Sequence, residues 1–396
     1  MSWLTVNPSS GQNNYNTVFT ASENTNSGDS RVTYVTVYNE QYNLSDICTV
    51  TQEPRDIETV TLSPSSYNGN YEASSVTVTV TANGNWSATT SYSGISINIQ
   101  SGTSGTTQVT ISFDRNKTLD ENSRYVIFKT QDTSTPFEIK QSARQPENNQ
   151  IFYTTHTEEI IDKWAVSAWT SGDTENWGTK LVSHTYEDFG IMTFNLPLTV
   201  IPANAFYKLD SSNDKPAPTR FVISSTITQI GNSAFYCNTY LTKINLGNIT
   251  YFEDNSFRDA ALNMKTDVWC TGLTYIGDYA FYKCRMSSNF INTKLNYIGD
   301  YAFWNNYFSE LKLPNITTRI FQYAFSNYNR GYLEKIYLDN STNAASSISV
   351  YAFYQAAPVS SGQGTGTLYT HSGYIPSAEG WTKALQNGGY RYVRSW

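Results

Sequence analysis

The chain has 396 residues, of which 39% are hydrophobic and 15% are charged, and its formal net charge is −7. Its 26 Lys and Arg residues are scattered along the sequence, which argues against nucleic acid and anionic membranes as partners. The sequence has no run of 18 apolar residues, so we expect no membrane-spanning helix. This length predicts two or three domains.

Aromatic and β-branched residues dominate the apolar part of the composition. The chain has 30 Tyr and 9 Trp, and such residues favour strands because they suit a pleated, half-buried surface. The four cysteines contain no CxxC pair, so they indicate neither a zinc framework nor a disulfide scaffold. We interpret them as reduced, buried apolar fillers; they are Cys48, Cys237, Cys270 and Cys284.

The first 145 residues read as strands separated by turns. Apolar and polar residues alternate with a period of two in several segments, and Asn- and Gly-containing turns such as 83–85 separate them. This pattern predicts antiparallel β-sandwiches. The strand-like segments are RVTYVTVYN (31–39), SVTVTVTA (75–82), TTQVTISFD (106–114) and RYVIFKTQ (124–131).

Two copies of one unit lie in this part of the chain, which we call the first module (1–54) and the second module (57–145). The second module has 89 residues and the first has 54. The front half of the second, residues 57–93, has no counterpart in the first. We therefore expect a partial first sandwich that lacks about 35 residues of N-terminal strands, and short linkers at 54–55 and 145–150.

Short motifs in both modules resemble the BACON domain, a Bacteroidetes-associated module whose name proposes carbohydrate binding. The motifs are SWLTVNPSSG, NWSATT and the endings VTQ (50–52) and IKQ (139–141). The resemblance implies an immunoglobulin-like sandwich on an exported protein, with a role that is often that of a spacer. Trp3 and Trp86 have two interpretations, as core residues or as platforms that stack on sugar rings.

An internal repeat begins beyond residue 190. Seven phenylalanines recur at intervals of 22 to 29 residues, and each except Phe257 follows an Ala. A large apolar residue stands five positions before each of them. Such a repeat predicts a solenoid, in which stacked coils share one core. The pairs are Ile201 and Phe206, Ile230 and Phe235, Phe252 and Phe257, Ile276 and Phe281, Ile298 and Phe303, Ile320 and Phe325, and Ile348 and Phe353.

The stretch YIGDYAF occurs twice, at 275–281 and 297–303. We expect its Ile and Phe to point inward and its Ala to fit a crowded corner. Gly277 is expected to adopt a positive φ, and Asp278 to cap a short helical turn in its own coil. Corners in which another residue replaces this glycine are expected to turn differently; they contain Glu253, Phe321 and Ser349.

The repeat T-x-I-G-x-x-A-F resembles the leucine-rich repeat of the BspA-like class. TITQIGNSAFYCN (226–238), LTYIGDYAFYKC (273–284) and LNYIGDYAFWNN (295–306) carry this resemblance. It covers about 151–396, with an N-terminal cap at about 151–190 and a C-terminal cap at about 360–396. The resemblance implies an adhesin or surface receptor that binds host proteins or other cells.

Two positions of the repeat are not needed for the core. Two residues before the phenylalanine, the last four coils have tyrosine, and these rings are expected to form a ladder. One residue after it lies a second aromatic set, Tyr207, Tyr236, Tyr282, Trp304 and Tyr354, which Arg258 and Ser326 interrupt. The ladder either binds a ligand or simply covers the solenoid flank. The candidate ligand-binding residues are Tyr279, Tyr301, Tyr323, Tyr351 and Trp304.

No pattern of residues indicates catalysis, a metal or a cofactor. His156, His184 and His371 lie in the caps, outside any HExxH or GxSxG context. The acidic pairs Glu158–Glu159 and Glu187–Asp188 are interpreted as solvated surface. The stretch DSSND (210–214) lacks the glycine of a calcium loop. We therefore expect no catalytic residues, no metal site and no cofactor.

These features predict a mainly β, multi-domain protein, with β-sandwich modules followed by a leucine-rich repeat solenoid. The leading hypothesis is a monomeric, non-catalytic binding or adhesion protein of the cell surface or the extracellular space, exported as a lipoprotein in a longer parent. Its solenoid would bind a protein such as a host matrix protein. The alternatives are a glycan- or mucin-binding accessory protein, which uses the sandwiches or the tyrosines, and a passive stalk.

Overall fold

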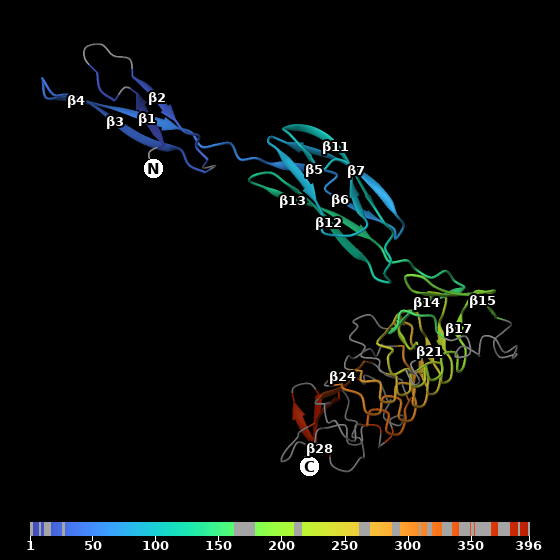
Figure 1. Ribbon diagram of the computed structural model, residues 1–396. Helices are drawn as coiled ribbons and strands as arrows, with labels where there is room; N and C mark the ends of the chain where they lie inside the picture. The colour runs from blue at the N-terminus through green and yellow to red at the C-terminus, as the bar shows by residue number, and fades with distance from the viewer. Residues whose placement is uncertain are drawn as a thin grey trace. The chain divides into compact units, whose positions relative to one another are not determined.

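The computed structural model of the protein divides into two compact units (Figure 1). Unit 1 comprises residues 1–116 and 120–143, and unit 2 comprises residues 117–119 and 144–396. Strands are the regular elements of the described residues, which include no helix. The structure describes residues 3–7, 9–11, 17–25, 28–161, 179–209, 216–260, 270–286, 294–308, 310–314, 319–326, 335–339, 349, 352, 366–370, 381–386 and 389–394.

The first module contains two separate strand pairs. Strand β1 (Leu4–Asn7) pairs antiparallel with β2 (Val18–Ala21). Strand β3 (Arg31–Asn39) pairs antiparallel with β4 (Leu44–Gln52). The bounds of β3 are those that the period-two pattern predicts. Large apolar side chains remain exposed on both pairs.

The second module is a two-sheet sandwich. One sheet has the order β5-β7-β11-β9, and the other has the order β10-β8-β12-β13-β6. The two sheets enclose a core of valine, isoleucine and phenylalanine side chains. The strands are β5 (Val60–Ser63), β6 (Ser66–Gly69), β7 (Ser74–Ala82), β8 (Trp86–Thr89), β9 (Ile95–Ile97), β10 (Ser101–Gly102), β11 (Gly105–Phe113), β12 (Asn122–Lys129) and β13 (Ser134–Gln141).

The two tryptophans of the modules have different environments. Trp86 is 3% exposed, and its ring lies 5.9 Å from that of Phe128. It is therefore a core residue, and the sugar-platform interpretation is wrong for it. Trp3 is half-buried, and the guanidinium of Arg31 lies 4.4 Å from the centre of its ring. One face of Trp3 is thus covered by a cation.

Equivalent hydrogen bonds align the two modules residue by residue. The buried amide of Asn24 donates to the carbonyls of Asp29 and Glu53. Asn116 donates in the same way to the carbonyls of Asp120 and Ser142. In the first module, Arg31 on β3 donates to Gln52, the last residue of β4. In the second module, Arg124 on β12 donates in the same way to Gln141, the last residue of β13. Strands β3 and β4 therefore correspond to β12 and β13.

This alignment explains the exposed face of the first module. In the second module, β8 pairs with β12, and β6 pairs with β13. No described strand of the first module occupies either place, and Val37, on β3, is 63% exposed. A front half equivalent to residues 57–93, which would cover this face, stays a prediction.

Unit 2 begins with a mixed sheet in the order β15-β16-β14-β18-β20. Strand β14 (Gln150–Thr155) lies in its middle, between β16 (Gly190–Phe194) and β18 (Pro218–Ile223). Strand β15 (Leu181–Tyr186) is one edge, and β20 (Lys243–Ile244), which pairs parallel with β18, is the other edge. The sheet thus joins the start of unit 2 to the repeat region.

A buried hydrogen-bond network joins Tyr153, on β14, to His184, on β15. The Tyr153 hydroxyl accepts the Ile161 N–H and lies 2.6 Å from Nε2 of His184. Burial raises the pKa of Tyr153, and burial lowers the pKa of His184. A protonated tyrosine and a neutral histidine therefore share this hydrogen bond at neutral pH.

We expect this histidine to make the stability of unit 2 depend on pH. Unfolded chain takes up the proton near pH 6.5, whereas folded protein takes it up only at a lower pH. The stabilisation of unit 2 by neutral His184 is complete above pH 6.5. It is lost as the pH falls through the lowered pKa of His184 in the folded protein. Calorimetry should give a flatter pH profile for His184→Gln between about pH 7 and pH 5. Identical profiles for the two proteins would contradict this assignment.

The repeat coils stack through a six-stranded parallel sheet in the order β17-β19-β21-β22-β23-β25. Each strand has two residues, and the second of them is the apolar residue of the repeat. The strands are β17 (Val200–Ile201), β19 (Gln229–Ile230), β21 (Tyr251–Phe252), β22 (Tyr275–Ile276), β23 (Tyr297–Ile298) and β25 (Arg319–Ile320). Figure 1 shows these coils in succession, from yellow-green to orange.

The last sheet has the order β24-β26-β27-β29-β28. Strands β24, β26 and β27 are parallel, and β28 and β29 form an antiparallel hairpin. The bounds are β24 (Glu310–Pro314), β26 (Lys335–Asp339), β27 (Gly366–Thr370), β28 (Trp381–Gln386) and β29 (Gly389–Arg394).

The repeat phenylalanines form one stacked column inside unit 2. The ring of Phe281 lies 5.5 Å from that of Phe257 and 5.4 Å from that of Phe303, with planes 6° and 0° apart. Ile276, Ala280 and Phe281 are all fully buried. The prediction that these residues point into a shared core is confirmed.

Two of the assignments within YIGDYAF are wrong. Gly277 does not have a positive φ; it is required because a Cβ there would lie 2.6 Å from the backbone nitrogen of Asp254, in the preceding coil. Asp278 caps no turn of its own. Its Oδ1 accepts the N–H of Asp300, and Oδ1 of Asp254 accepts the N–H of Asp278, both at 2.8 Å. Glycine and aspartate therefore set the spacing between coils.

Corners without the glycine retain the same hydrogen bond between coils, so the expectation that they turn differently is wrong in this respect. The N–H of Glu253 donates to the Ile230 carbonyl at 2.9 Å, and that of Gly277 donates to the Phe252 carbonyl at 2.8 Å. Phe321 makes the equivalent bond at 3.0 Å. Backbone pairing between coils overrides the residue type at this corner.

The four cysteines have different environments. Cys270 and Cys284 are buried, and their thiols donate to the carbonyls of Leu246 and Phe257. Burial raises the pKa of both thiols. The filler interpretation fits these two residues. It is wrong for Cys48, which is exposed, and Cys237 is only partly buried.

Candidate ligand-binding surface

In the six coils whose residue is described, the position two before the phenylalanine lies in the left-handed region of the backbone. Asn204, Ser233 and Asn255 have φ of 58°, 54° and 57°. In the next three coils this position is a tyrosine with the same backbone angle: Tyr279 at 57°, Tyr301 at 55° and Tyr323 at 55°. Asparagine tolerates this conformation, whereas tyrosine adopts it rarely. The backbone thus stays constant while the side chain changes.

These tyrosines form a stacked column. The ring of Tyr301 lies 5.0 Å from that of Tyr279 and 4.9 Å from that of Tyr323, with planes 8° and 21° apart. The predicted ladder therefore exists for these three residues, and Tyr351 lies outside the described residues. The rings cover one another's faces, so the column presents ring edges and hydroxyl groups to the solvent.

A second column lies one residue after each phenylalanine, and Arg258 does not interrupt it. Tyr207 stacks on Tyr236 at 5.0 Å, and Tyr282 stacks on Trp304 at 4.6 Å. The guanidinium carbon of Arg258 lies 5.7 Å from the Tyr236 ring centre and 5.1 Å from that of Tyr282. A guanidinium is planar and stacks on aromatic faces, so Arg258 continues the column where the sequence indicated a gap.

Arg258 also connects the two columns. Its guanidinium carbon lies 4.9 Å from the centre of the Tyr279 ring. The rings of Tyr279 and Tyr282 are 5.6 Å apart. Asn255 accepts a hydrogen bond from Nη1 of Arg258 at 3.2 Å, and Oδ2 of Asp259 lies 3.6 Å from its Nε. These contacts hold the guanidinium among three tyrosine rings.

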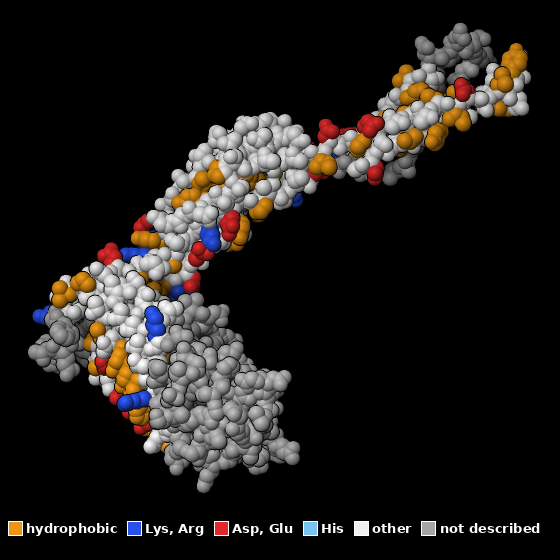
Figure 2. All heavy atoms as spheres, turned by 180° about the vertical axis from the view of Figure 1, so that it is seen from behind, with side chains coloured by type: hydrophobic (Ala, Val, Ile, Leu, Met, Phe, Trp, Pro, Cys, Tyr) orange, Lys and Arg blue, Asp and Glu red, His pale blue; other side chains and the backbone are white. Residues whose placement is uncertain are grey.

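Lysines follow the second column. Nζ of Lys283 lies 5.2 Å from the Tyr282 ring centre and 5.6 Å from that of Trp304. Lys208 lies in the same way over Tyr207. The aromatic–cation patch, as we name it, consists of Arg258, Tyr279, Tyr282, Lys283, Tyr301 and Trp304. Figure 2 shows hydrophobic and cationic side chains side by side on the described surface of unit 2.

Tyr282 and Tyr301 are hydrogen-bond donors at neutral pH. Burial raises the pKa of both Tyr282 and Tyr301. Their hydroxyl groups therefore stay protonated. The patch combines aromatic edges, neutral hydroxyls and cations, an arrangement that suits binding.

Sequence reasoning placed Tyr282 in the second aromatic set but did not name it as a candidate, and it missed Arg258 and Lys283 as members of this surface. The alignment of the repeats could have identified them. Arg258 and Tyr282 occupy the same repeat position as the candidate Trp304, and Lys283 directly follows Tyr282. A further column, which the sequence did not single out, lies on the six-stranded sheet. Tyr275 stacks on Tyr251 at 4.1 Å and on Tyr297 at 4.3 Å. Burial raises the pKa of Tyr251 and Tyr275 to about 12.

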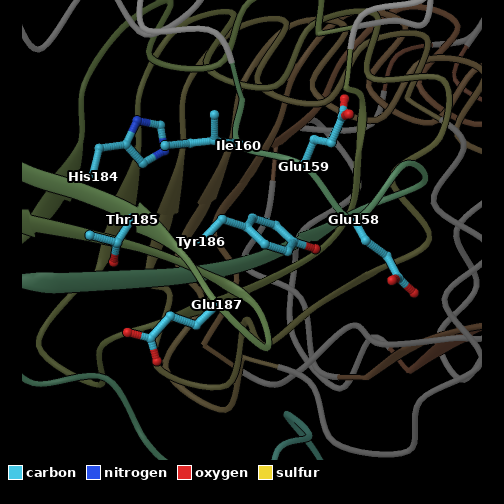
Figure 3. A pocket seen from close by; sticks show the side chains of 7 residues that line it. All are labelled: Glu158, Glu159, Ile160, His184, Thr185, Tyr186 and Glu187. Atoms are coloured by element: carbon cyan, nitrogen blue, oxygen red, sulfur yellow. The ribbon is translucent and has the colours of Figure 1, made fainter.

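A pocket of about 820 Å³ in unit 2 is lined by His184 and acidic residues. Glu158, Glu159 and Glu187 line it, and Figure 3 shows that their carboxylates point in different directions. Among the described residues, no group of three or more His, Cys, Asp or Glu side chains is placed to hold a metal ion. The stretch 210–214 and His371 lie outside the described residues.

Family models match most of the chain. The model described as the BspA type leucine rich repeat region matches in six copies, over residues 178–285 and 263–370. The BACON model matches residues 1–53, and the viral BACON domain model matches residues 59–140. This chain is a BspA-like leucine-rich repeat protein with N-terminal BACON domains. The resemblances inferred from the short motifs are confirmed.

These families are binding domains, and BspA-like repeat proteins and BACON domains are typical of cell-surface or exported proteins. The fold of this BspA-like protein is mainly β and multi-domain, as predicted. No helix among the described residues is long and apolar enough to cross a membrane. A search of the curated proteins found no match.

Comparison with solved structures gave only distant similarities. A Bacteroides ovatus GH5 xyloglucanase in complex with a XXXG heptasaccharide is 18% identical, covers 26% of this chain and has a TM-score of 0.21; the match spans 21% of the xyloglucanase. Domains 4–9 of the surface layer protein SbsC are 14% identical, with 42% of this chain and 31% of that chain covered and a TM-score of 0.19. TM-scores this low support no structural argument.

Proposed function

We propose that this BspA-like protein is a non-catalytic adhesion protein of the cell surface or the extracellular space. Its solenoid binds a protein partner, such as a host matrix protein, through the aromatic–cation patch and Tyr323. The observation that carries the proposal is the placement of Tyr279, Tyr301 and Tyr323 at left-handed backbone positions. The first coils fill the same position with asparagine or serine.

Stability does not explain these tyrosines. A left-handed conformation costs an ordinary residue about 1–2 kcal/mol. A stacked aromatic pair returns about 0.5–1.5 kcal/mol beyond its buried area, so the two effects nearly cancel. Backbone strain that is retained without a gain in stability concentrates at functional sites. Tyrosine, tryptophan and arginine are also the residues that dominate binding energy at protein interfaces.

The test is the triple variant Tyr279→Asn, Tyr301→Asn, Tyr323→Asn in the full chain. Asparagine is chosen because Asn204 and Asn255 hold the same backbone angle. We expect the unfolding temperature to change little, and binding to immobilised host matrix proteins to weaken at least tenfold, which corresponds to about 1.4 kcal/mol. Surface plasmon resonance measures the binding.

Tyr240→Asn is the matched control. Tyr240 is 40% exposed and stacks on His156, outside the patch. Its loss should leave the binding unchanged. If the triple variant binds the matrix proteins as tightly as the parent protein, the patch is only a cover for the solenoid flank.

A glycan remains the second candidate ligand, and it is favoured at a different place. The tyrosine rings of the ladder cover one another's faces. A ring that lies between two others, such as Tyr301, therefore has no free face on which a sugar ring could stack. In the second module, however, Tyr92 is 40% exposed, and its ring lies 6.4 Å from that of Tyr125. A glycan array that detects binding by the full chain, and loses it with Tyr92→Ser, would favour this alternative.

We propose the following organisation around this function. The first module (1–54) and the second module (57–145) act as spacers, and residues 151–396 form the binding solenoid, capped at about 151–190 and about 360–396. The protein is monomeric and is exported, as a lipoprotein in a longer parent. A globomycin-sensitive, lipid-labelled product of the expressed parent gene is the expected result.

A further inference from the structure

We propose that the aromatic–cation patch and the neighbouring Lys208 accept an extended segment of a partner protein that carries carboxylate side chains. This inference rests on the proposed function, since it names the chemistry of the partner at the same surface. The inference is based on the positive charges along the second column and on the orientation of the aromatic rings.

The charge of this surface is opposite to that of the chain as a whole. The formal net charge of the chain is −7, yet Lys208, Arg258 and Lys283 follow one column. Asp259 is 3.6 Å from Arg258. In the part of the chain that the structure describes, neither Lys208 nor Lys283 forms an ion pair with a carboxylate. Both lysines are exposed, so an incoming carboxylate can reach them.

The orientation of the rings selects an elongated ligand. Tyr282 and Trp304 stack with planes 8° apart, and Tyr279 and Tyr301 do the same. Their free edges and hydroxyls thus repeat along the direction of coil stacking, at about 5 Å per coil, as adjacent strands of a sheet do. Phenolic hydroxyls donate hydrogen bonds to carboxylates. An extended segment that runs across the coils would meet a donor or a cation at each step.

An acidic row limits how much negative charge the ligand can carry. Each carboxylate of Asp254, Asp278 and Asp300 accepts the backbone N–H of the corresponding residue in the next coil. Asp278 and Asp300 immediately precede Tyr279 and Tyr301 of the ladder, and Asp254 precedes Asn255 at the same position of its coil. They would repel a densely sulfated polymer, whereas spaced carboxylates on a peptide can pair with the cations of the other column. This border favours a peptide over a sulfated glycan.

The test measures fluorescence anisotropy with a labelled peptide of repeating Glu-Ser, and with a matched peptide of repeating Gln-Ser, on the full chain. We expect tighter binding of the Glu-Ser peptide, and weaker binding as NaCl is raised, because salt screens exposed charges. The double variant Lys208→Gln, Lys283→Gln should weaken binding about fivefold. Lys243→Gln, an exposed lysine on β20 outside the patch, should have no effect.

Three results would overturn the inference: equal affinity for the two peptides, an equal loss in Lys243→Gln, or binding of heparin with no binding of the Glu-Ser peptide. The matrix-protein assay separates this inference from the proposed function. If the asparagine triple variant loses matrix-protein binding and the lysine double variant does not, adhesion through the patch stands and the carboxylate ligand is wrong. If neither variant loses binding, both proposals fail.

Discussion

Phe281→Ala is expected to destabilise unit 2 by about 3–5 kcal/mol, which is the usual loss when a buried phenylalanine becomes alanine. The ring is fully buried and contacts three others, those of Phe252, Phe257 and Phe303. In stacked repeats each coil depends on its neighbours for stability. The cavity therefore weakens two interfaces between coils. Calorimetry of the full chain should resolve this change as a lower unfolding temperature of unit 2.

Thr239→Ala is the control for this experiment. Thr239 is exposed, and its backbone N–H, which the substitution retains, donates to the Cys237 carbonyl. We expect a change of no more than about 0.5 kcal/mol, as is usual for surface positions. The assignment of Phe281 to a shared core would be wrong if the two variants unfolded at the same temperature.

Gly277→Ala is expected to destabilise the protein by about 3 kcal/mol, at the upper end of overpacking effects. The added Cβ would lie 2.6 Å from the Asp254 nitrogen and 2.7 Å from the Glu253 carbonyl carbon. Both are backbone atoms, so no side-chain rotation relieves the contact. The coil of Phe281 must move away from the coil before it, which lengthens the 2.8 Å hydrogen bond from the Gly277 N–H to the Phe252 carbonyl.

Gly247→Ala supplies a control of opposite sign. No atom lies within 4 Å of a Cβ built at this exposed glycine, and its φ is not positive. Alanine there should stabilise the protein by about 0.4–1 kcal/mol, because it reduces the freedom of the unfolded chain. Chemical denaturation of the two variants should move the midpoint in opposite directions. A shift of both midpoints in the same direction would contradict the close-approach role of Gly277.

The core of the fold could be predicted from the sequence because its signal is local and periodic. The offset of five residues between Ile276 and Phe281 recurs in every coil, and an apolar pattern reports directly on burial. Alternation with a period of two predicted β3 at Arg31–Asn39 for the same reason. The spacing between coils could not be predicted. Gly277 and Asp278 act on atoms of neighbouring coils, about 22 to 24 residues away, and a single repeat contains no sign of that approach.

The candidate surface was predictable only in part. The register aligned Tyr279, Tyr301 and Tyr323, and these rings do stack. Their left-handed backbone was not foreseen, because residue type alone assigns that conformation to glycine or asparagine. Arg258 was taken for an interruption, since a residue count distinguishes aromatic from charged side chains but does not reveal that a guanidinium can stack as a ring does.

The constant left-handed angle at one position of the six coils described there has a consequence for sequence change over evolution. Asn255 and Tyr279 hold the same backbone at 57°, so an exchange between these residue types leaves the coil path unaltered. A repeat array built in this way can vary its outer row one residue at a time, with no compensating change in the core. Related repeat proteins with the same buried residues can therefore bind different partners. New side chains could also be designed at this position of the present array without changing its core.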